Sequence, residues 1–297
     1  VEIVRRAVDA GVNFVDTADC YTEGRAEEIT GEAIAPIRDQ VVLASKVGVR
    51  VGEGPNDMGG SRYHIVRGVE ASLQRLATDR LDLLYIHWPF EALALEETLR
   101  AFEDLVRAGK VLYLGCSNFP AWLMMRSLWI QDVRGYLPFV AGQYPYSLIE
   151  RGLEVEMLQA ASAMGIGLVT YRPLCTGLLT GKYLEGVPED SRGVGNDQAS
   201  EWAERYREPV AALVQFAKAR NLTAADVAIA WVRSARGVTS PIVCVSSMKQ
   251  LEANLKGFEW SMTAEEREEL SEVFPTAPWE AAWGSFPKWR RSFEIMP

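Results

Sequence analysis

The feature that most constrains the fold of this chain is a regular alternation of short apolar runs with amphipathic stretches. Runs rich in Val, Leu, Ile and Tyr predict seven strands, at 13–18, 41–47, 81–88, 111–118, 139–146, 167–174 and 240–247. Most of them lack polar alternation, which is typical of parallel strands buried on both faces. The first six runs start at residues 13, 41, 81, 111, 139 and 167, and this spacing is the length of a βαβ unit.

The stretches between these runs have helical periodicity. In 61–78, apolar side chains recur at helical spacing, and Ser61 is placed to cap the helix. His64 falls in the first turn of that helix, and we expect it to face solvent. A second helix is predicted over 95–110, and two more, 207–220 and 223–235, fall in the long gap before the last strand.

Seven strand–helix alternations favour a (β/α) barrel in one domain spanning 1–297, with a doubly wound sheet as the alternative. A doubly wound dinucleotide-binding sheet usually carries G-x-G-x-x-G after its first strand, and no strand here is followed by it. The barrel is therefore preferred. The loop 186–200, rich in Gly, Asp and Asn, is predicted to belong to a cofactor flap over about 175–206, or else to be a passive surface insertion.

Composition excludes several classes of function. The net charge of −9 argues against nucleic-acid binding, and no apolar run approaches the roughly 20 residues of a membrane span. Four cysteines without a CxxC pair, and only two histidines, argue against a disulfide framework and a metal site. We expect reduced thiols, a cytoplasmic protein, and small buried side chains at Cys116, Cys175 and Cys244.

Four polar residues fall at the carboxyl ends of the first three strands, where a barrel builds its active site. They are Asp16, Tyr21, Lys46 and His87. An ammonium beside a tyrosine lowers the pKa of the phenol from its usual value near 10. Asp16 would orient Lys46, and His87 would donate to a substrate oxygen. The set predicts proton transfer at a carbonyl or alcohol oxygen, coupled to hydride transfer from a bound cofactor.

Each of the four also has a structural interpretation. His87 could be a hydrogen-bonded core histidine, Asp16 a helix cap and Tyr21 a packing residue. Their joint placement at consecutive strand ends favours catalysis, because independent structural residues have no reason to converge there. Further polar residues lie late in the next three strands, at Ser117, Asn118, Gln143, Tyr171 and Arg172.

Several stretches of the chain resemble the aldo-keto reductase family in order and spacing, over residues 1 to about 274. They include NFVDTADCYTEGRAEEITGEAI, VVLASKVG, SLQRLATDRLDLLYIHWP, GCSNF, QYPYSLIE, YRPLCTGLLTGKY and SSMKQLEANL. The resemblance implies a (β/α)8 barrel and an NADP(H)-dependent reductase of aldehydes and ketones. It also implies that the family's catalytic tetrad falls on Asp16, Tyr21, Lys46 and His87.

The resemblance assigns cofactor-binding roles as well. Ser117, Asn118 and Gln143 would hold the nicotinamide carboxamide, and Tyr171 would stack on its ring. A second group would line the pyrophosphate: Arg172, Pro173, Leu174, Cys175, Thr176 and Lys182. Ser246, Gln250 and Asn254 would hold the adenosine end. Ser246 stands where the family often has a basic residue, and Ala253 replaces a common acidic one, so we expect NADP(H) with NAD(H) as an alternative.

A third departure lies at the ends of the chain. The family's N-terminal hairpin and first barrel strand have no counterpart before Val1, so we expect seven of the eight strands and two unpaired sheet edges. A shortened gene model, a tolerated open barrel, or a barrel closed by the C-terminal SFEIMP would explain this. The tail 275–297 carries Trp279, Trp283 and Trp289, and is predicted to line the substrate pocket or to pack under the barrel.

Three hypotheses follow. The first is an NADP(H)-linked carbonyl reductase acting on a small molecule. The second is a non-catalytic NADP(H)-binding subunit or sensor, as in the family's channel-associated members, and the third is a truncated, inactive family member. The physiological substrate, the direction of reaction and the choice between a monomer and a homo-oligomer are left open by the sequence.

Overall fold

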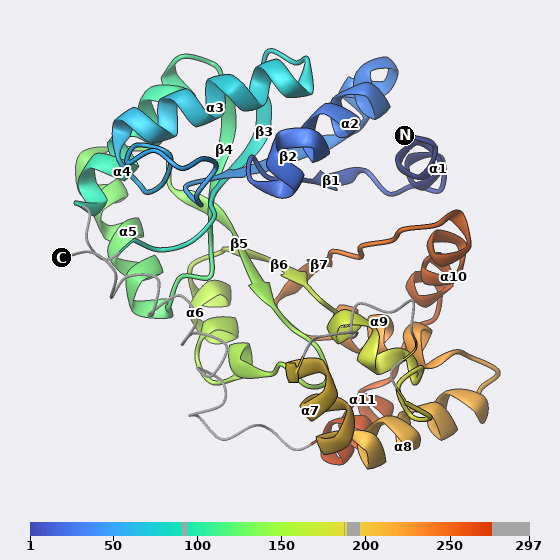
Figure 1. The fold of residues 1–297 in the computed structure, drawn as a ribbon. Coiled ribbons are helices and arrows are strands. Elements are labelled where there is room, and N and C mark those ends of the chain that lie inside the picture. The colour runs from blue at the N-terminus through green and yellow to red at the C-terminus, as the bar shows by residue number, and fades with distance from the viewer. Residues whose placement is uncertain (91–93, 187, 189–196, 275–297) are drawn as a thin grey trace. The chain divides into compact units, whose positions relative to one another are not determined.

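The computed structural model describes residues 1–90, 94–186, 188 and 197–274. The chain divides into two compact units (Figure 1). Unit 1 consists of Val1–Gln143 and Ala161–Gly167, and unit 2 of Tyr144–Ala160 and Leu168–Pro297. Part of the predicted cofactor flap, 187 and 189–196, and the whole predicted aromatic tail, 275–297, lie outside the described residues.

Unit 1 is built from alternating strands and helices. In chain order these are α1 (Glu2–Asp9), β1 (Phe14–Asp16), η1 (Tyr21–Gly24), α2 (Arg25–Ile34), η2 (Ala35–Gln40), β2 (Val42–Val47), α3 (Arg62–Leu76), β3 (Leu81–Ile86), α4 (Leu95–Arg107), β4 (Val111–Ser117), α5 (Ala121–Arg134) and β5 (Phe139–Pro145), whose last two residues belong to unit 2. Each strand from β1 to β4 pairs in parallel with the next. This register brings the carboxyl ends of neighbouring strands to the same edge of the sheet.

The core of unit 1 confirms burial on both faces for β2 and β3, whereas β4 exposes Leu112 and Tyr113. Every residue of β3 is buried, as are the last five of β2. Ala44, Leu83, Tyr85 and Ala141 form one apolar cluster, with Phe14 packed against it. The small alanines leave room for the Tyr85 ring, which is fully buried.

The first turn of α3 differs from one prediction. The Ser61 hydroxyl caps the helix as expected, since it accepts a hydrogen bond from the His64 backbone N–H at 3.3 Å. The solvent-facing position expected for His64 is wrong, because its side chain is buried and Nδ1 lies 3.0 Å from the Asn56 carbonyl oxygen. The loop that precedes α3 covers the helix start, a contact that helical periodicity does not reveal. This burial lowers the pKa of His64.

Unit 2 contains the remaining elements. These are η3 (Gly152–Glu154), α6 (Met157–Ala163, which ends in unit 1), β6 (Gly167–Tyr171, whose first residue belongs to unit 1), η4 (Cys175–Thr180), α7 (Asp197–Arg205), α8 (Arg207–Lys218), α9 (Ala224–Arg233), β7 (Val238–Pro241), α10 (Met248–Glu259) and α11 (Ala264–Val273). Helices α9 and α11 both begin with capping boxes, Thr223 with Asp226 and Thr263 with Glu266.

Strand β7 corrects the boundaries predicted for the last strand, 240–247. It covers only Val238–Pro241 and pairs in parallel with β6, starting at Leu168 and Val238. One more backbone hydrogen bond, from Ile242 to Thr170, follows before the pairing stops. Because β6 ends at Tyr171, the apolar residues after Ile242 have no strand to pair with. Cys244 is exposed there, so its predicted burial is wrong, whereas Cys116 and Cys175 are buried as expected.

The strand order across the chain is sequential, from β1 to β7. Sequential parallel strands with intervening helices are the pattern of a (β/α) barrel, here with seven strands in the described residues. A doubly wound sheet would reverse its strand order at a switch point, so that alternative is wrong.

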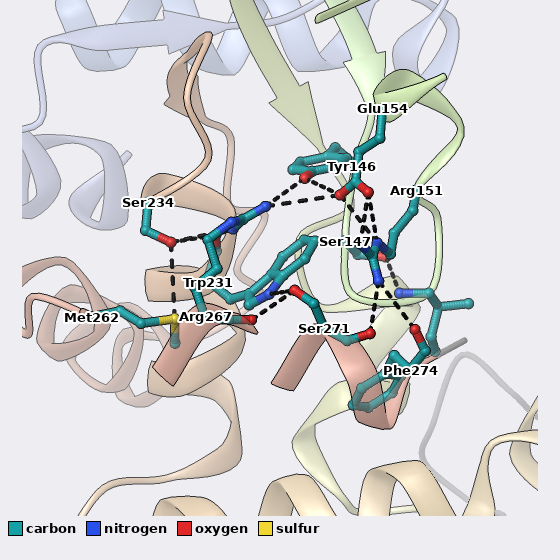
Figure 2. Close-up of polar contacts among 11 residues, drawn as sticks. Tyr146, Ser147, Arg151, Glu154, Trp231, Ser234, Met262, Arg267, Ser271 and Phe274 are labelled. Carbon is teal, nitrogen blue, oxygen red and sulfur yellow. Dashed lines mark hydrogen bonds and ion pairs between the residues drawn. The ribbon is translucent and has the colours of Figure 1, made fainter. Parts of the chain in front are cut away.

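A buried tryptophan organises polar contacts in unit 2 (Figure 2). Trp231 of α9 has the guanidinium carbons of Arg267 and Arg151 at 4.0 and 5.6 Å from its ring. Its indole N–H donates to the Ser271 hydroxyl at 3.1 Å. Arg267 also donates to the Tyr146 hydroxyl at 2.8 Å. These contacts join α9 and α11 to the segment that follows β5.

Candidate active site

The four residues predicted to form a catalytic tetrad come together in unit 1. Lys46 of β2 forms an ion pair with Oδ1 of Asp16 at the end of β1. Its Nζ also lies 2.8 Å from the Thr17 carbonyl oxygen and 3.3 Å from the Tyr21 hydroxyl. The Lys46 side chain is fully buried, so the ammonium is held by these oxygens rather than by water. Lys46 therefore links the acidic residue to the tyrosine.

The segment after β1 places Tyr21 over these strand ends. Backbone N–H groups of Thr17 and Asp19 donate to the carbonyl oxygens of Ala44 and Lys46, so the chain stays beside β2 after β1 has ended. The chain then turns through three left-handed residues, of which Gly24 has φ +88°. A Cβ at Gly24 would lie 2.7 Å from the Arg75 side chain. The left-handed backbone angle favours glycine at this position, and a larger residue would also have to displace the Arg75 side chain.

The charge states of Tyr21 and Lys46 follow from competition between burial and neighbouring charges. Burial raises the pKa of the Tyr21 phenol and outweighs the lowering by the Lys46 ammonium. The ammonium thus acts in the expected direction, but the net shift of the Tyr21 pKa is upward because burial is the larger cause. Burial alone would lower the pKa of Lys46, but the Asp16 carboxylate and the contact with Tyr21 raise it overall. At neutral pH the site holds a protonated phenol beside an ammonium.

His87 follows β3 directly and is buried. Its backbone N–H donates to the Val47 carbonyl oxygen at 3.0 Å, which continues the pairing of β2 with β3. The imidazole and the Tyr21 ring are in edge contact, with centroids 5.8 Å apart. Burial, together with the Lys46 charge, lowers the pKa of His87 to about 3. The imidazole is neutral at physiological pH and offers one N–H donor.

Three residues expected at the nicotinamide join the same group in unit 1. The Gln143 side-chain amide donates to Oδ2 of Asp16 at 2.7 Å. The Ser117 hydroxyl donates to the Gln143 carbonyl oxygen at 3.0 Å, and Asn118 Nδ2 donates to the His87 carbonyl oxygen at 3.2 Å. All three are buried, with hydroxyl and amide groups next to the tetrad. This donor and acceptor set fits a primary carboxamide such as that of nicotinamide.

The predicted pyrophosphate residues follow β6 in unit 2. The backbone is left-handed at Arg172, Cys175, Thr176 and Gly177, so the chain turns tightly here. The Arg172 guanidinium forms an ion pair with Glu150 at 3.2 Å and donates to the Thr176 hydroxyl at 3.2 Å. Lys182 is exposed just beyond η4. Two cations beside a tight turn fit an anionic phosphate group. Tyr171 ends β6, and Pro173 and Leu174 occupy the turn.

The residues predicted at the adenosine end lie at the start of α10. Gln250 Oε1 accepts hydrogen bonds from the Ser246 backbone N–H at 2.8 Å and from the Ser246 hydroxyl at 3.0 Å. Ser247 caps the helix, since its hydroxyl accepts from the Gln250 backbone N–H at 3.3 Å. Asn254 lies one turn further along and is buried. Ser246 and Gln250 are exposed, so a helix N-terminus with free surface is available there.

Two residues beside the tetrad were missed by sequence reasoning. Cys20 Sγ lies 3.7 Å from His87 Nδ1, and a carboxylate oxygen of Asp19 lies within 4.8 Å of the Cys20 sulfur and of a His87 ring nitrogen. Both residues stand between Asp16 and Tyr21 in the sequence, in the loop at the strand ends. Only this loop position could have pointed to them, because neither an aspartate nor a cysteine there completes a pattern typical of proton transfer.

A family model described as "Aldo/keto reductase family" matches residues 1–274. The chain belongs to the aldo/keto reductase family. The match covers both units and all seven strands, as expected from the resemblance.

Relatives of the chain include several named oxidoreductases. The chain is 36% identical over 284 residues to "Uncharacterized oxidoreductase YrpG" of Bacillus subtilis (strain 168), which covers 92% of this chain and 86% of the relative. It is 32% identical over 267 residues to "L-glyceraldehyde 3-phosphate reductase" of Escherichia coli O157:H7, over 86% and 77% of the two chains. The family and these names support an oxidoreductase.

Another relative has a name of a different kind. The chain is 36% identical over 260 residues to "Probable voltage-gated potassium channel subunit beta" of Arabidopsis thaliana, over 84% of this chain and 79% of the relative. Within the described residues, no helix is long and apolar enough to cross a bilayer.

Proposed function

We propose that this member of the aldo/keto reductase family reduces an aldehyde or ketone to an alcohol, with Tyr21 donating the proton to the carbonyl oxygen. The observation that carries the proposal is the position of Lys46 Nζ, which is paired with Asp16 and lies 3.3 Å from the Tyr21 hydroxyl. A buried ammonium next to a phenol stabilises the tyrosinate that forms when the proton leaves.

The charge states support a division of roles. Burial raises the pKa of Tyr21, so the phenol carries its proton at neutral pH and can act as an acid. The neutral His87 imidazole can donate an N–H to the substrate oxygen without competing as an acid. Asp16 holds the ammonium of Lys46 in place. When bound, a nicotinamide cofactor supplies the hydride.

The proposed cofactor is NADP(H), with NAD(H) as the alternative. Each unit carries part of the expected donor set. In unit 1 it comprises Ser117, Asn118 and Gln143; in unit 2 it comprises Tyr171, Arg172, Pro173, Leu174, Cys175, Thr176, Lys182, Ser246, Gln250 and Asn254. Ser246 offers a hydroxyl rather than a cation to a 2′-phosphate. The proposal keeps the cytoplasmic setting expected from the cysteine pattern and a small carbonyl compound as the substrate.

The experiment compares Tyr21→Phe with Tyr113→Phe in the reduction of 4-nitrobenzaldehyde by NADPH. Tyr113 is 53% exposed on β4 and serves as the matched control. We expect Tyr21→Phe to lose turnover by about 10²-fold or more, the usual contribution of a positioned acid. NADPH binding, followed by fluorescence, is expected to persist in both variants. Turnover retained by Tyr21→Phe contradicts the assignment.

A second candidate function is a non-catalytic NADP(H)-binding subunit, favoured by the potassium channel beta subunits among the relatives. It needs the cofactor donors but not an acid at Tyr21. Stable NADPH binding by the wild-type protein without turnover of any carbonyl compound would support it. A truncated, inactive family member would show neither nucleotide binding nor cooperative unfolding.

A further inference from the structure

A buried carboxylate beside the tetrad has no side-chain partner among the described residues, and only the backbone N–H of the adjacent Cys20 approaches it. Asp19 is 3% exposed, and neither of its carboxylate oxygens accepts a hydrogen bond of good geometry. In the part of the chain that the structure describes, no cation forms an ion pair with it. A buried polar group without a partner costs about 1–3 kcal/mol, and more when charged, so such a group requires an explanation.

The neighbouring charges are already paired with one another. Lys46 is paired with Asp16, and Arg75 is paired with Glu27 at 2.7 Å. Glu27 also accepts a hydrogen bond from the Ser45 hydroxyl at 2.6 Å. These two pairs are neutral, and burial raises the pKa of Asp19 to about 7, so its carboxyl group is only partly ionised at neutral pH. If Asp19 and the adjacent Cys20 both lost their protons to a metal ion, the site would carry a charge of −2, which one divalent cation neutralises.

The atoms around Asp19 are metal-binding types at suitable distances. Cys20 Sγ and His87 Nδ1 lie 3.7 Å apart. Tetrahedral zinc bonds of ~2.3 Å to sulfur and ~2.0 Å to nitrogen separate these two ligand atoms by about 3.5 Å. An Asp19 oxygen lies within 4.8 Å of the Cys20 sulfur and of a His87 ring nitrogen. Rotation of the carboxylate about its Cβ–Cγ bond can bring that oxygen closer.

We propose that Asp19, Cys20 and His87 form a binding site for a zinc ion. One carboxylate oxygen, one thiolate and one imidazole nitrogen make a borderline-soft donor set that suits zinc rather than magnesium or calcium. Three protein ligands leave a fourth position for water. Cys20 is only half-buried, so the ion can reach the site from solvent. The site does not depend on the proposed reductase function.

The site has a defined relation to the tetrad. The ion would bind the imidazole through Nδ1, the nitrogen that faces Cys20. The remaining proton of the neutral ring would then be on Nε2. Zinc would therefore hold His87 in one tautomer. The His87 ring contacts the Tyr21 ring.

The test uses metal binding rather than catalysis. The full chain is reduced, treated with chelator and desalted, and Zn²⁺ affinity is measured by competition with a chromophoric chelator. We expect one zinc per chain, with at least about tenfold weaker binding in Cys20→Ser and in Asp19→Asn. Cys244→Ser, which changes an exposed cysteine outside the cluster, is the matched control and is expected to bind as the wild type does.

Co²⁺ provides a second readout that reports the ligand type. The wild-type protein and Cys244→Ser are expected to show a cobalt–thiolate absorption band in the near ultraviolet, and Cys20→Ser is expected to lack it. Circular dichroism and thermal unfolding establish that each variant is folded. Absence of stoichiometric zinc binding by the wild-type chain overturns the proposal, as does a thiolate band that persists in Cys20→Ser and disappears in Cys244→Ser.

Discussion

The Gln143 side-chain amide donates a 2.7 Å hydrogen bond to Oδ2 of Asp16, joining two residues that are 127 positions apart in the sequence. The other carboxylate oxygen of Asp16 is paired with Lys46. Both oxygens of the carboxylate are thus held, one by a charged partner and one by an amide. In the proposed function, this bond connects a nicotinamide-binding residue to the tetrad.

Replacing Gln143 by Leu is expected to destabilise unit 1. The change leaves one oxygen of a buried carboxylate unsatisfied, and the loss of a hydrogen bond to a charged group costs about 1.5–3 kcal/mol. Urea unfolding measures the free energy. Gln74→Leu, at an exposed position of α3, is the control and should change it by less than ~0.5 kcal/mol. Equal effects of the two substitutions would show that the Gln143 bond has no special contribution.

The pairing of Lys46 with Asp16 predicts strong energetic coupling. Lys46→Met removes the charged partner of a buried carboxylate, a change that typically costs about 3–5 kcal/mol. Adding Asp16→Asn removes the uncompensated charge, so the double variant should lose less stability than the sum of the two single variants. A double-mutant cycle from denaturant unfolding measures the difference. Strict additivity would refute the coupling.

The position of Arg267 against Trp231 predicts that lysine cannot replace arginine there. Arg267 packs its guanidinium on the indole ring at 4.0 Å and also donates to Tyr146 at 2.8 Å (Figure 2). Lysine keeps the charge but loses the planar fork, so we expect Arg267→Lys to cost about 1–2 kcal/mol. Arg236→Lys, at an exposed position near β7, is the control for unit 2. If thermal unfolding of the two variants coincides, the stacked guanidinium contributes nothing.

The buried carboxyl of Glu150 is expected to make the thermal stability of the protein depend on pH. Burial raises the pKa of this carboxyl, and the nearby Arg172 only partly opposes the shift. Because the pKa of Glu150 is raised in the folded state, protonated Glu150 stabilises the fold fully at pH values below its ordinary pKa of 4.5. This stabilisation is lost as pH rises through the folded pKa. Glutamine mimics the protonated form, so Glu150→Gln should gain thermal stability over the wild type as pH rises from about 5 to 8.

In Glu150→Gln, Arg172 loses its charged partner. Arg172 keeps a 38% exposed side chain, so the guanidinium can be solvated when its partner is neutral. A gain of about 2–4 °C in Tm is expected for each kcal/mol. Glu201→Gln, at an exposed position of α7, should show no pH-dependent difference. A Tm difference for Glu150→Gln that shrinks with rising pH contradicts the direction of the pKa shift.

Replacing Ser246 by arginine is expected to shift the cofactor preference toward NADPH. Ser246 is exposed at the N-terminus of α10 and offers only a hydroxyl to a 2′-phosphate. Ser246→Arg adds a guanidinium that pairs with phosphate, so the ratio of kcat/KM for NADPH to that for NADH should rise about tenfold, equivalent to ~1.4 kcal/mol. Ser200→Arg, outside α10, is the control. A wild-type protein that strongly prefers NADH would contradict the proposed NADP(H) cofactor.

The sequence by itself determined the succession of strands and helices and the residues at the strand ends. Parallel strands buried on both faces need continuous apolar runs, and the length of a crossover helix sets their spacing. Asp16, Tyr21, Lys46 and His87 could therefore be singled out, because polar residues that end apolar strands meet at one edge of a parallel sheet. The last strand was misplaced because strand length depends on the partner, and β6 ends at Tyr171.

Only the tertiary structure decided the environments of these residues. The pKa of Tyr21 is raised rather than lowered because desolvation, which depends on every atom packed around the phenol, outweighs one ammonium. His64 is buried because the loop before α3 folds over the start of the helix. The position of Cys20 beside His87 requires the turn after β1 and the end of β3 to meet. Burial and distance are properties of the assembled neighbours, whereas periodicity records only each segment's own preference.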